Sequence, residues 1–270
     1  MPRLNPRDAA TRVERDLDGL SPNDFSEALA RGLRVLTAFD ASRPRMTLAE
    51  VARGVDLPRA TVRRSLWTLV ALGYVRLDGR SFELTPRVLT LAGAYLSASS
   101  ISTVLQPACE ALCDAVGMST SVAVLDGEEA VMIARAVPNK LMVLEVAIGY
   151  RVPALHSSLG RVLLSALDDA ALDEFLASHA PHPSTSFSVT DVETLRSRIR
   201  AVRDDGYAYV DREAEYGYRS IAVPVRRADG RVVAAFNVGG HTDRIDEETM
   251  MTSILARLRA VADTASSQIL

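Results

Sequence analysis

One short part of this sequence is rich in arginine, a residue type that binds anions. The stretch TLAEVARGVDLPRATVRRSLWTLVALGYVRLDGRSFEL, residues 47–84, holds six arginines among regularly spaced apolar residues, although the chain is acidic overall. A hydrophobic core requires the apolar spacing but not the cations. Guanidinium groups bind phosphates and the edges of guanine, so the stretch indicates an anionic partner such as double-stranded DNA.

The apolar spacing predicts the elements that would present these arginines. A first helix is expected over 25–40, with Leu29 and Leu33 at helical spacing. Thr47 and Glu50 form a capping-box pattern that begins a second helix, and Gly54 is expected to supply the turn after it. A third helix then runs to about Gly73, and YVRL-DG-RSFEL is typical of a hairpin. Three helices followed by a hairpin indicate a winged helix-turn-helix.

The third helix is expected to bury Val62, Leu66 and Leu69 and to turn its cationic side to DNA. Trp67 is interpreted as a packing residue against the hairpin or the linker, with a base contact as the alternative. The candidate DNA contacts are Arg59, Ala60, Thr61, Arg63 and Arg64 of this helix and Arg76 and Arg80 of the hairpin. A solvated cationic face is the alternative reading.

Charge is divided unevenly along the chain. Residues 25–85 contain ten arginines and six acidic residues, whereas residues 86–270 contain 17 basic and 23 acidic residues. This difference favours a polyanionic partner for the first part only.

The whole chain is expected to be an α+β protein with an antiparallel sheet in its second part. From Pro86 the pattern is helical, with interruptions near 99–102 and before Pro107. Strands are expected on both sides of Asp126–Gly127, over 141–149 and, as a group of three, over 207–240, with helices between and after them. The predicted boundaries are a flexible arm (1–24), a winged helix-turn-helix (25–85), a linker helix (86–104) and an effector-binding domain (105–270).

We find no pattern of catalytic, metal-binding or nucleotide-binding residues. Cys109 and Cys113 lie one helical turn apart with no further ligand nearby, and His179 and His182 share a proline-rich loop without an acidic ligand. His156 precedes two serines, but no nucleophile elbow surrounds them. We therefore expect no enzyme activity, no metal and no cofactor. No apolar run reaches the length of a membrane span, and we expect a cytoplasmic protein.

The segment HSSLGRVLL places Ser157 and Ser158 where a helix begins. Hydroxyls and the free N–H groups of a first helical turn can bind a small carboxylate. Ordinary N-capping is the better explanation for one of the two serines, but not clearly for both.

Five blocks of the sequence, in their order and spacing, resemble the IclR-type transcriptional regulators over about residues 25–260. They are the 47–84 segment, FELTPRVL, SSLGRVLLSAL, GYAYVDREAEYGYRSIAVPV and GRVVAAFNVGG. The blocks ARGLRVLTAFDASRPRMTLAEVA and FELTPRVLTLAGAYLSA look most like the branch that controls aromatic-acid breakdown through the β-ketoadipate pathway. Effectors in that branch include protocatechuate, 4-hydroxybenzoate and β-ketoadipate.

The resemblance implies binding to palindromic operators as a homodimer or a dimer of dimers, and a small organic acid in a pocket of the second domain. The residues matching the family's pocket are Ser157, Ser158, Leu159, Gly160, Asp211, Arg219, Ser220, Ile221, Asn237 and Gly239. Leu155 stands where many relatives have His or Tyr, and His156 stands where they have a small residue. Some relatives place Ser or Thr at the positions of Asn237 and Gly239, so the identity of the effector stays open.

A buried carboxylate ligand needs a cation or a hydrogen-bond donor. Arg135 and Arg219 are the best-placed cations by pattern, although either could instead pair with Asp211 or Glu145. An aromatic ring would suit the apolar side chains Met132, Ile133, Met142 and Leu144. The alternatives are a regulator of a non-aromatic acid such as glyoxylate or pyruvate, a ligand-independent DNA-binding protein, and an enzyme with an appended DNA-binding module.

Overall fold

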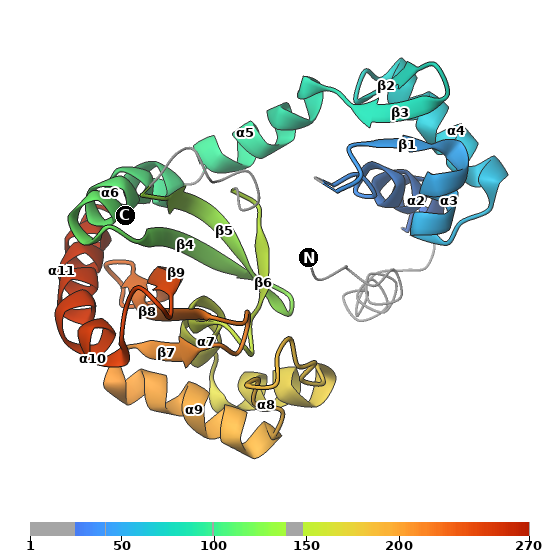
Figure 1. Ribbon diagram of the computed structural model, residues 1–270. Helices are drawn as coiled ribbons and strands as arrows, with labels where there is room; N and C mark the ends of the chain where they lie inside the picture. Colours follow the sequence, from blue (N-terminus) through green and yellow to red (C-terminus); the bar gives the residue numbers. More distant parts are fainter. Residues whose placement is uncertain (1–24, 41, 99, 139–147, 270) are drawn as a thin grey trace. The chain divides into compact units, whose positions relative to one another are not determined.

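A computed structural model describes residues 25–40, 42–98, 100–138 and 148–269 (Figure 1). The predicted arm, and most of the strand predicted over 141–149 with Met142, Leu144 and Glu145, lie outside these residues. The chain divides into two compact units, Met1–Ala94 and Tyr95–Leu270. The border between the units falls within the predicted linker.

The first unit contains the predicted three helices and hairpin. Its helices are α2 (Glu27–Leu36), α3 (Leu48–Val55) and α4 (Arg59–Ala71). Its antiparallel sheet has the order β1 (Arg45–Thr47), β3 (Ser81–Leu84), β2 (Val75–Asp78). Strand β1 was not expected, because three residues are too few to show an alternating pattern. The architecture is that of a winged helix-turn-helix.

Local signals explain most of the boundaries in this unit. The Thr47 hydroxyl accepts from the Glu50 N–H, and the Glu50 carboxylate accepts from the Thr47 N–H, which confirms the capping box. Gly73 has a φ of +78°, and the N–H of the next residue returns to the carbonyl of Leu69, which ends α4. The turn after α3 is made by Asp56 in the left-handed conformation and not, as expected, by Gly54, which lies inside the helix.

The core of the first unit includes Val35, Val51, Val62, Leu66 and Phe82. Leu29 and Leu33, which share helical spacing on α2, are 62% and 51% exposed. The buried side of α2 is therefore the one that carries Val35.

The second unit begins within α5 (Leu89–Ala98), which follows a 3-10 turn at Pro86–Val88. The next helix, α6 (Ser100–Val116), runs through Pro107, so the interruption expected before that proline is absent. In the described part of the chain no single helix is long and apolar enough to cross a membrane. The helical pair Pro86–Ala98 and Ile101–Val116 meets the criteria only together, across a sharp bend.

An antiparallel six-stranded sheet forms the centre of this unit, in the order β6-β5-β4-β9-β8-β7. The strands are β4 (Ser119–Asp126), β5 (Glu129–Ala136), β6 (Arg151–Pro153), β7 (Ala208–Asp211), β8 (Tyr218–Arg226) and β9 (Val232–His241). The remaining helical elements are α7 (Ser158–Ser165), α8 (Asp169–Ser178), α9 (Val192–Asp205), α10 (Glu247–Thr249), a π-helical turn (Met250–Ile254) and α11 (Leu255–Ser266).

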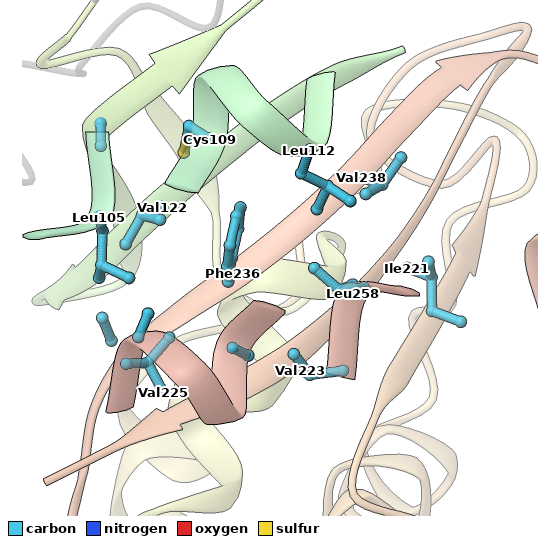
Figure 2. Close-up of a cluster of buried hydrophobic side chains, with 14 of the residues drawn as sticks. Leu105, Cys109, Leu112, Val122, Ile221, Val223, Val225, Phe236, Val238 and Leu258 are labelled. Atoms are coloured by element: carbon cyan, nitrogen blue, oxygen red, sulfur yellow. The ribbon is translucent and has the colours of Figure 1, made fainter. Parts of the chain in front are cut away.

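The two faces of the sheet have different covers. Helices α6 and α11 pack on one face, where Leu105 and Leu258 meet Val122 and Phe236 of the strands (Figure 2). Helix α7 packs on the other face against small residues such as Ala222, and α8 and α9 pack outside α7. This mixed helix and antiparallel-sheet fold confirms the expected fold class.

Candidate DNA-binding surface and candidate small-molecule site

The outward side of α4 is cationic, and no described residue neutralises it. Arg59, Arg63 and Arg64 are exposed, and none of them makes an ion pair with a residue in the described ranges. The first turn of α4 has no acidic residue and no side-chain cap. Cations near a helix N-terminus are unfavourable because the helix dipole is positive there. The arrangement is therefore suited to an external anion such as a DNA phosphate.

The other predicted contacts of α4 fit the same surface. Ala60 is exposed and Thr61 is partly exposed, while Val62, Leu66 and Leu69 are buried as expected. Trp67 packs edge-on against Phe82 of β3, with ring centroids 6.4 Å apart, which confirms its packing role.

The two arginines of the hairpin differ in their surroundings. The strand pairing places Arg45, Glu83 and Arg76 in one row across the three-stranded sheet, and both arginines bind the Glu83 carboxylate. Arg45 also binds Asp78, so this face balances its own charges. Arg80, next to the hairpin turn, is exposed and has no ion pair with a described residue. Arg80 is therefore the freer of the two predicted wing contacts.

A polar row crosses the sheet on the face covered by α7. In an antiparallel sheet, directly paired residues point to the same side. Ser121 of β4 pairs with Arg135 of β5 and with Asn237 of β9, so all three share this face. The Arg135 guanidinium donates from Nη1 to the Ser121 hydroxyl at 2.9 Å. Its Nε is buried and has no hydrogen-bond partner among the described residues.

The start of α7 closes this face. The Ser158 and Ser220 hydroxyls lie 2.8 Å apart, which joins α7 to β8, and Ser220 pairs with Gly239 on β9. The Ser157 hydroxyl accepts from the N–H of Gly160, so Ser157 is the capping serine. Ser158 is left for another role, as the sequence suggested.

Two of the predicted pocket residues serve mainly to pack α7. A Cβ on Gly160 would lie 2.1 Å from the Ala154 Cα, so only glycine permits this close approach of two main chains. Leu159 is buried against the sheet. No described residue accepts a hydrogen bond from the N–H groups of Ser158 or Leu159, which begin the helix.

Tyr218 is a residue of this face that the sequence analysis missed. It lies two residues before Ser220 on β8, and a Cβ on Gly239 would lie 2.1 Å from its hydroxyl oxygen. The residue is partly exposed, but its hydroxyl lies against the β9 main chain. Burial raises the pKa of Tyr218 to about 12, against the opposing effect of the nearby Arg135 charge. The phenol is therefore neutral and can donate a hydrogen bond. The period-two alternation of β8 could have identified both Tyr218 and Ser220.

Three predicted pocket residues lie on the opposite face of the sheet. Ile221 is buried in the core beneath α6 and α11. Arg219 alternates with Ser220 and binds Asp211, with 3.1 Å between Nε and Oδ1. The structure therefore places Asp211, Arg219 and Ile221 apart from Ser158, Ser220, Asn237, Gly239 and Arg135. Of the two candidate cations, Arg219 takes the structural ion pair that was considered as an alternative. Ile133 also faces the α6 side, while Met132 lies on the α7 side within 3.5 Å of the Arg135 guanidinium.

A buried ionic cluster lies on the outer side of α7. The Arg161 guanidinium binds the Glu213 carboxylate, with 2.6 Å between Nη2 and Oε2. Arg198 binds the other carboxylate oxygen, and the His156 ring lies 3.7 Å away. Burial alone would raise the pKa of Glu213, but the neighbouring His156 ring and the Arg161 charge lower it to about 2. His156 therefore belongs to a structural cluster and is not paired with a serine nucleophile.

A cleft of about 470 Å³ lies beside α9 and β7. Its charged lining residues are Arg161, Arg198, Asp205, Asp211 and Glu213. The carboxylates outnumber the arginines, and two of the three already bind arginine side chains. This cleft therefore does not suit an organic acid.

Comparisons with known proteins identify the same two parts of the chain. The sequence matches the family models "IclR helix-turn-helix domain" over residues 28–79 and "Bacterial transcriptional regulator IclR C-terminal" over residues 93–267. It is 40% identical over 240 residues to the Pca regulon regulatory protein of Pseudomonas putida, covering 88% of this chain and 82% of that protein.

Two further proteins are informative. The p-hydroxybenzoate hydroxylase transcriptional activator of Acinetobacter baylyi is 35% identical over 245 residues, covering 89% of this chain and 90% of that protein. The crystal structure of an IclR homolog from Microbacterium hydrocarbonoxydans, complexed with 4-hydroxybenzoate, superimposes with a TM-score of 0.74. The sequences are 27% identical, and the match covers 89% of this chain and 98% of that one.

Proposed function

Because the chain belongs to the IclR family of bacterial transcriptional regulators, we propose that α4 binds operator DNA and that a small aromatic acid controls this binding from the α7 face of the sheet. The observation that supports binding of an acid on this face is the environment of Arg135. Its guanidinium lies among polar groups on that face, and its buried Nε has no hydrogen-bond partner in the described part of the chain. A buried donor without a partner is costly, and a carboxylate ligand would satisfy it.

The DNA contacts follow from the free cations of the first unit. Arg59, Arg63 and Arg64 can bind guanine edges or phosphates from one side of α4, and the small Ala60 lets the helix lie deep in the major groove. Arg80 reaches a neighbouring phosphate from the hairpin. Arg76 contributes less, because Glu83 already occupies its guanidinium.

The effector would lie across the polar row. Its carboxylate binds Arg135, with the Ser121 hydroxyl and the neutral Tyr218 phenol as neighbouring donors. A hydroxyl at the far end of the ring can meet Ser158 and Ser220 and the free N–H groups that begin α7. The thioether of Met132 provides an apolar contact for the ring.

The relatives support an aromatic acid. The two curated relatives regulate the Pca regulon and p-hydroxybenzoate hydroxylase, and the Microbacterium structure holds 4-hydroxybenzoate. We propose protocatechuate or 4-hydroxybenzoate as the effector, and genes of aromatic-acid catabolism as the target.

We also propose that the protein binds a palindromic operator as a homodimer or a dimer of dimers. Four leucines of the first unit, Leu29 and Leu33 of α2 and Leu89 and Leu91 of α5, are exposed apolar side chains that a second copy could cover. Two-fold symmetry of the protein would then match two-fold symmetry of the DNA site.

Thermal melting with a panel of acids tests the effector. The panel is protocatechuate, 4-hydroxybenzoate, β-ketoadipate, glyoxylate and pyruvate. A ligand present at about 100 times its Kd stabilises the folded protein by about 2.7 kcal/mol, which raises Tm measurably. We expect a shift with an aromatic acid, and a changed affinity for operator DNA when that acid is added.

Arg135→Gln and Arg219→Gln form a matched pair for the same experiment. Each removes one strand arginine from the sheet, but from opposite faces. We expect Arg135→Gln to abolish the Tm shift and Arg219→Gln to retain it. A Tm shift lost only in Arg219→Gln would show that the effector binds on the α6 and α11 face and not on the α7 face proposed here. A shift with glyoxylate or pyruvate alone would refute the aromatic effector.

A further inference from the structure

The side chain of Gln106, on α6, binds the main chain of Arg135 from both ends of its amide. The Gln106 Oε1 accepts from the Arg135 N–H at 3.0 Å, and the Gln106 Nε2 donates to the Arg135 carbonyl at 3.0 Å. Among the described residues, the outer edge of β5 pairs with β6 from Glu129 to Val131 and bonds to Gly149 and Tyr150 at Met132, and no strand pairs with it at Arg135. The Gln106 amide therefore bonds to the edge of β5 as a neighbouring strand would. It does so at Arg135, whose guanidinium is the proposed cation for the acid.

The two ends of Arg135 thus face different parts of the second unit. Its main chain is held by α6, while its guanidinium donates to Ser121 and keeps a buried Nε without a partner among the described residues. A movement of Arg135 toward a carboxylate would shift the main-chain groups that Gln106 holds.

The hydrogen-bond ladder of α6 lacks one bond beside this contact. Pro107 lies inside the helix directly after Gln106, and it has no N–H to donate to the carbonyl of Thr103. A helix bends most readily where its hydrogen-bond ladder is interrupted. Along the chain, α6 follows α5, and α5 continues from the DNA-binding unit.

We propose that Gln106 is the positioning residue that couples the effector site to the helix leading to the DNA-binding unit. This inference rests on the proposed function. Gln106 holds Arg135 where it can bind the acid, and it transmits the displacement of β5 on binding to α6. Coupling requires that the effector bind two arrangements of β5 and α6 unequally, and the amide bridge is the contact that distinguishes them.

Gln106→Leu tests the role, because leucine has a similar size but cannot make either hydrogen bond. Thr120→Val is the matched control. It removes a different link between α6 and the sheet, the 2.8 Å bond from the Thr120 hydroxyl to the Cys109 carbonyl, without touching Arg135. Operator affinity is measured by fluorescence anisotropy without acid and with saturating 4-hydroxybenzoate or protocatechuate, and calorimetry gives the Kd of the acid.

We expect the acid to change the operator affinity of the wild type by at least about fivefold, a usual size for allosteric coupling. In Gln106→Leu this ratio should fall to between one and about two, while Thr120→Val keeps the wild-type ratio even if its Tm is lower. If the substitutions only destabilise the fold, Tm should change in both variants, while the ratio of operator affinities with and without acid should change in neither.

The outcomes separate the two ideas. A wild-type ratio that Gln106→Leu retains in full overturns the role of Gln106 and leaves the regulator intact. If Thr120→Val loses the ratio equally, the effect is not specific to Gln106, because removing another link between α6 and the sheet has the same result. That outcome also overturns the proposed role of Gln106. A wild type whose operator affinity ignores every acid in the panel overturns the proposed function and the coupling role with it.

Discussion

Single residues determine the stability of the α7 region through one buried ion pair. The Arg161 and Glu213 side chains are 2% and 5% exposed and lie 2.6 Å apart. The Arg161 Nε also donates to the Leu155 carbonyl, and the Val189 N–H donates to the Glu213 carboxylate. The pair therefore ties the loop before α7, α7 itself and the segment after β7 together. A buried pair adds little over an apolar pair, but breaking it leaves an uncompensated charge.

We predict that Glu213→Gln lowers the free energy of unfolding by about 3–5 kcal/mol, because Arg161 then stays buried without its counter-ion. Urea unfolding measures the change. Glu193→Gln, which removes an exposed partner of Arg196, is the control and should cost less than about 0.5 kcal/mol. Equal losses in the two variants would contradict a special role for the buried pair.

The same pair predicts an acid-dependent loss of stability. The pKa of Glu213 is held at about 2 in the folded protein, below its usual value of 4.5. Its contribution is complete above pH 4.5 and declines as the pH falls from there toward about 2. The unfolding free energy of the wild type should therefore fall more steeply over this interval than that of Glu213→Gln. Parallel slopes would show that Glu213 titrates normally in the folded state.

Gly239 gives a third prediction at the residue scale. A side chain there would collide with the Tyr218 ring, so Gly239→Ala should displace the phenol and destabilise the protein by about 1–3 kcal/mol. It should also weaken binding of the acid by removing a donor from beside Arg135. Gly32→Ala is a suitable control, because a Cβ at Gly32 meets no atom within 4 Å. Calorimetric Tm and acid Kd report the two effects, and an unchanged Kd would exclude Tyr218 from the site.

At the scale of elements, α4 and the hairpin both hold exposed arginines, but in different surroundings. The arginines of α4 are free of described acidic partners, whereas Arg76 shares Glu83 with Arg45. Exposure alone does not distinguish Arg76 from the arginines of α4. The strand pairing does, because it places Arg76 in one row with Glu83 and Arg45.

We predict that Arg63→Ala and Arg64→Ala each weaken operator binding by about 1–3 kcal/mol, or about 5- to 150-fold, so that specific binding is lost at wild-type concentrations at the upper end of this range, while acid binding is intact. Arg76→Ala should cost less, because its guanidinium is already neutralised. Anisotropy titrations at several salt concentrations would also show a reduced salt slope for any arginine that contacts phosphate. Wild-type operator affinity in either α4 variant would place the recognition surface elsewhere.

At the scale of the whole molecule, the sequence predicted the helices and hairpins that depend on local patterns. Apolar periodicity, the Thr47 capping box and the Asp–Gly turns located the helices and hairpins, because these signals lie within a few residues of one another. Strand β1 was missed because it is short, and Gly54 was preferred to Asp56 because glycine is the commoner turn residue.

The candidate site was predicted less well, because it depends on contacts across the sheet. The resemblance named Ser220 together with its neighbours Arg219 and Ile221, although a strand directs adjacent side chains to opposite faces. Alternation alone could have separated them and added Tyr218. The bond between Gln106 and Arg135, 29 residues apart, leaves no local signal in the sequence.

The balanced charges of the hairpin have a consequence for how the regulator finds its target. Every phosphate that a protein neutralises lengthens its stay on random DNA as well as on the correct site. Because Arg45 of β1 and Arg76 of the hairpin already bind Glu83 and Asp78, these two cations contribute less to binding of the DNA backbone. We therefore expect the protein to dissociate from unrelated DNA faster than its arginine content would suggest, and to depend on Arg80 and the arginines of α4 for binding at its operator.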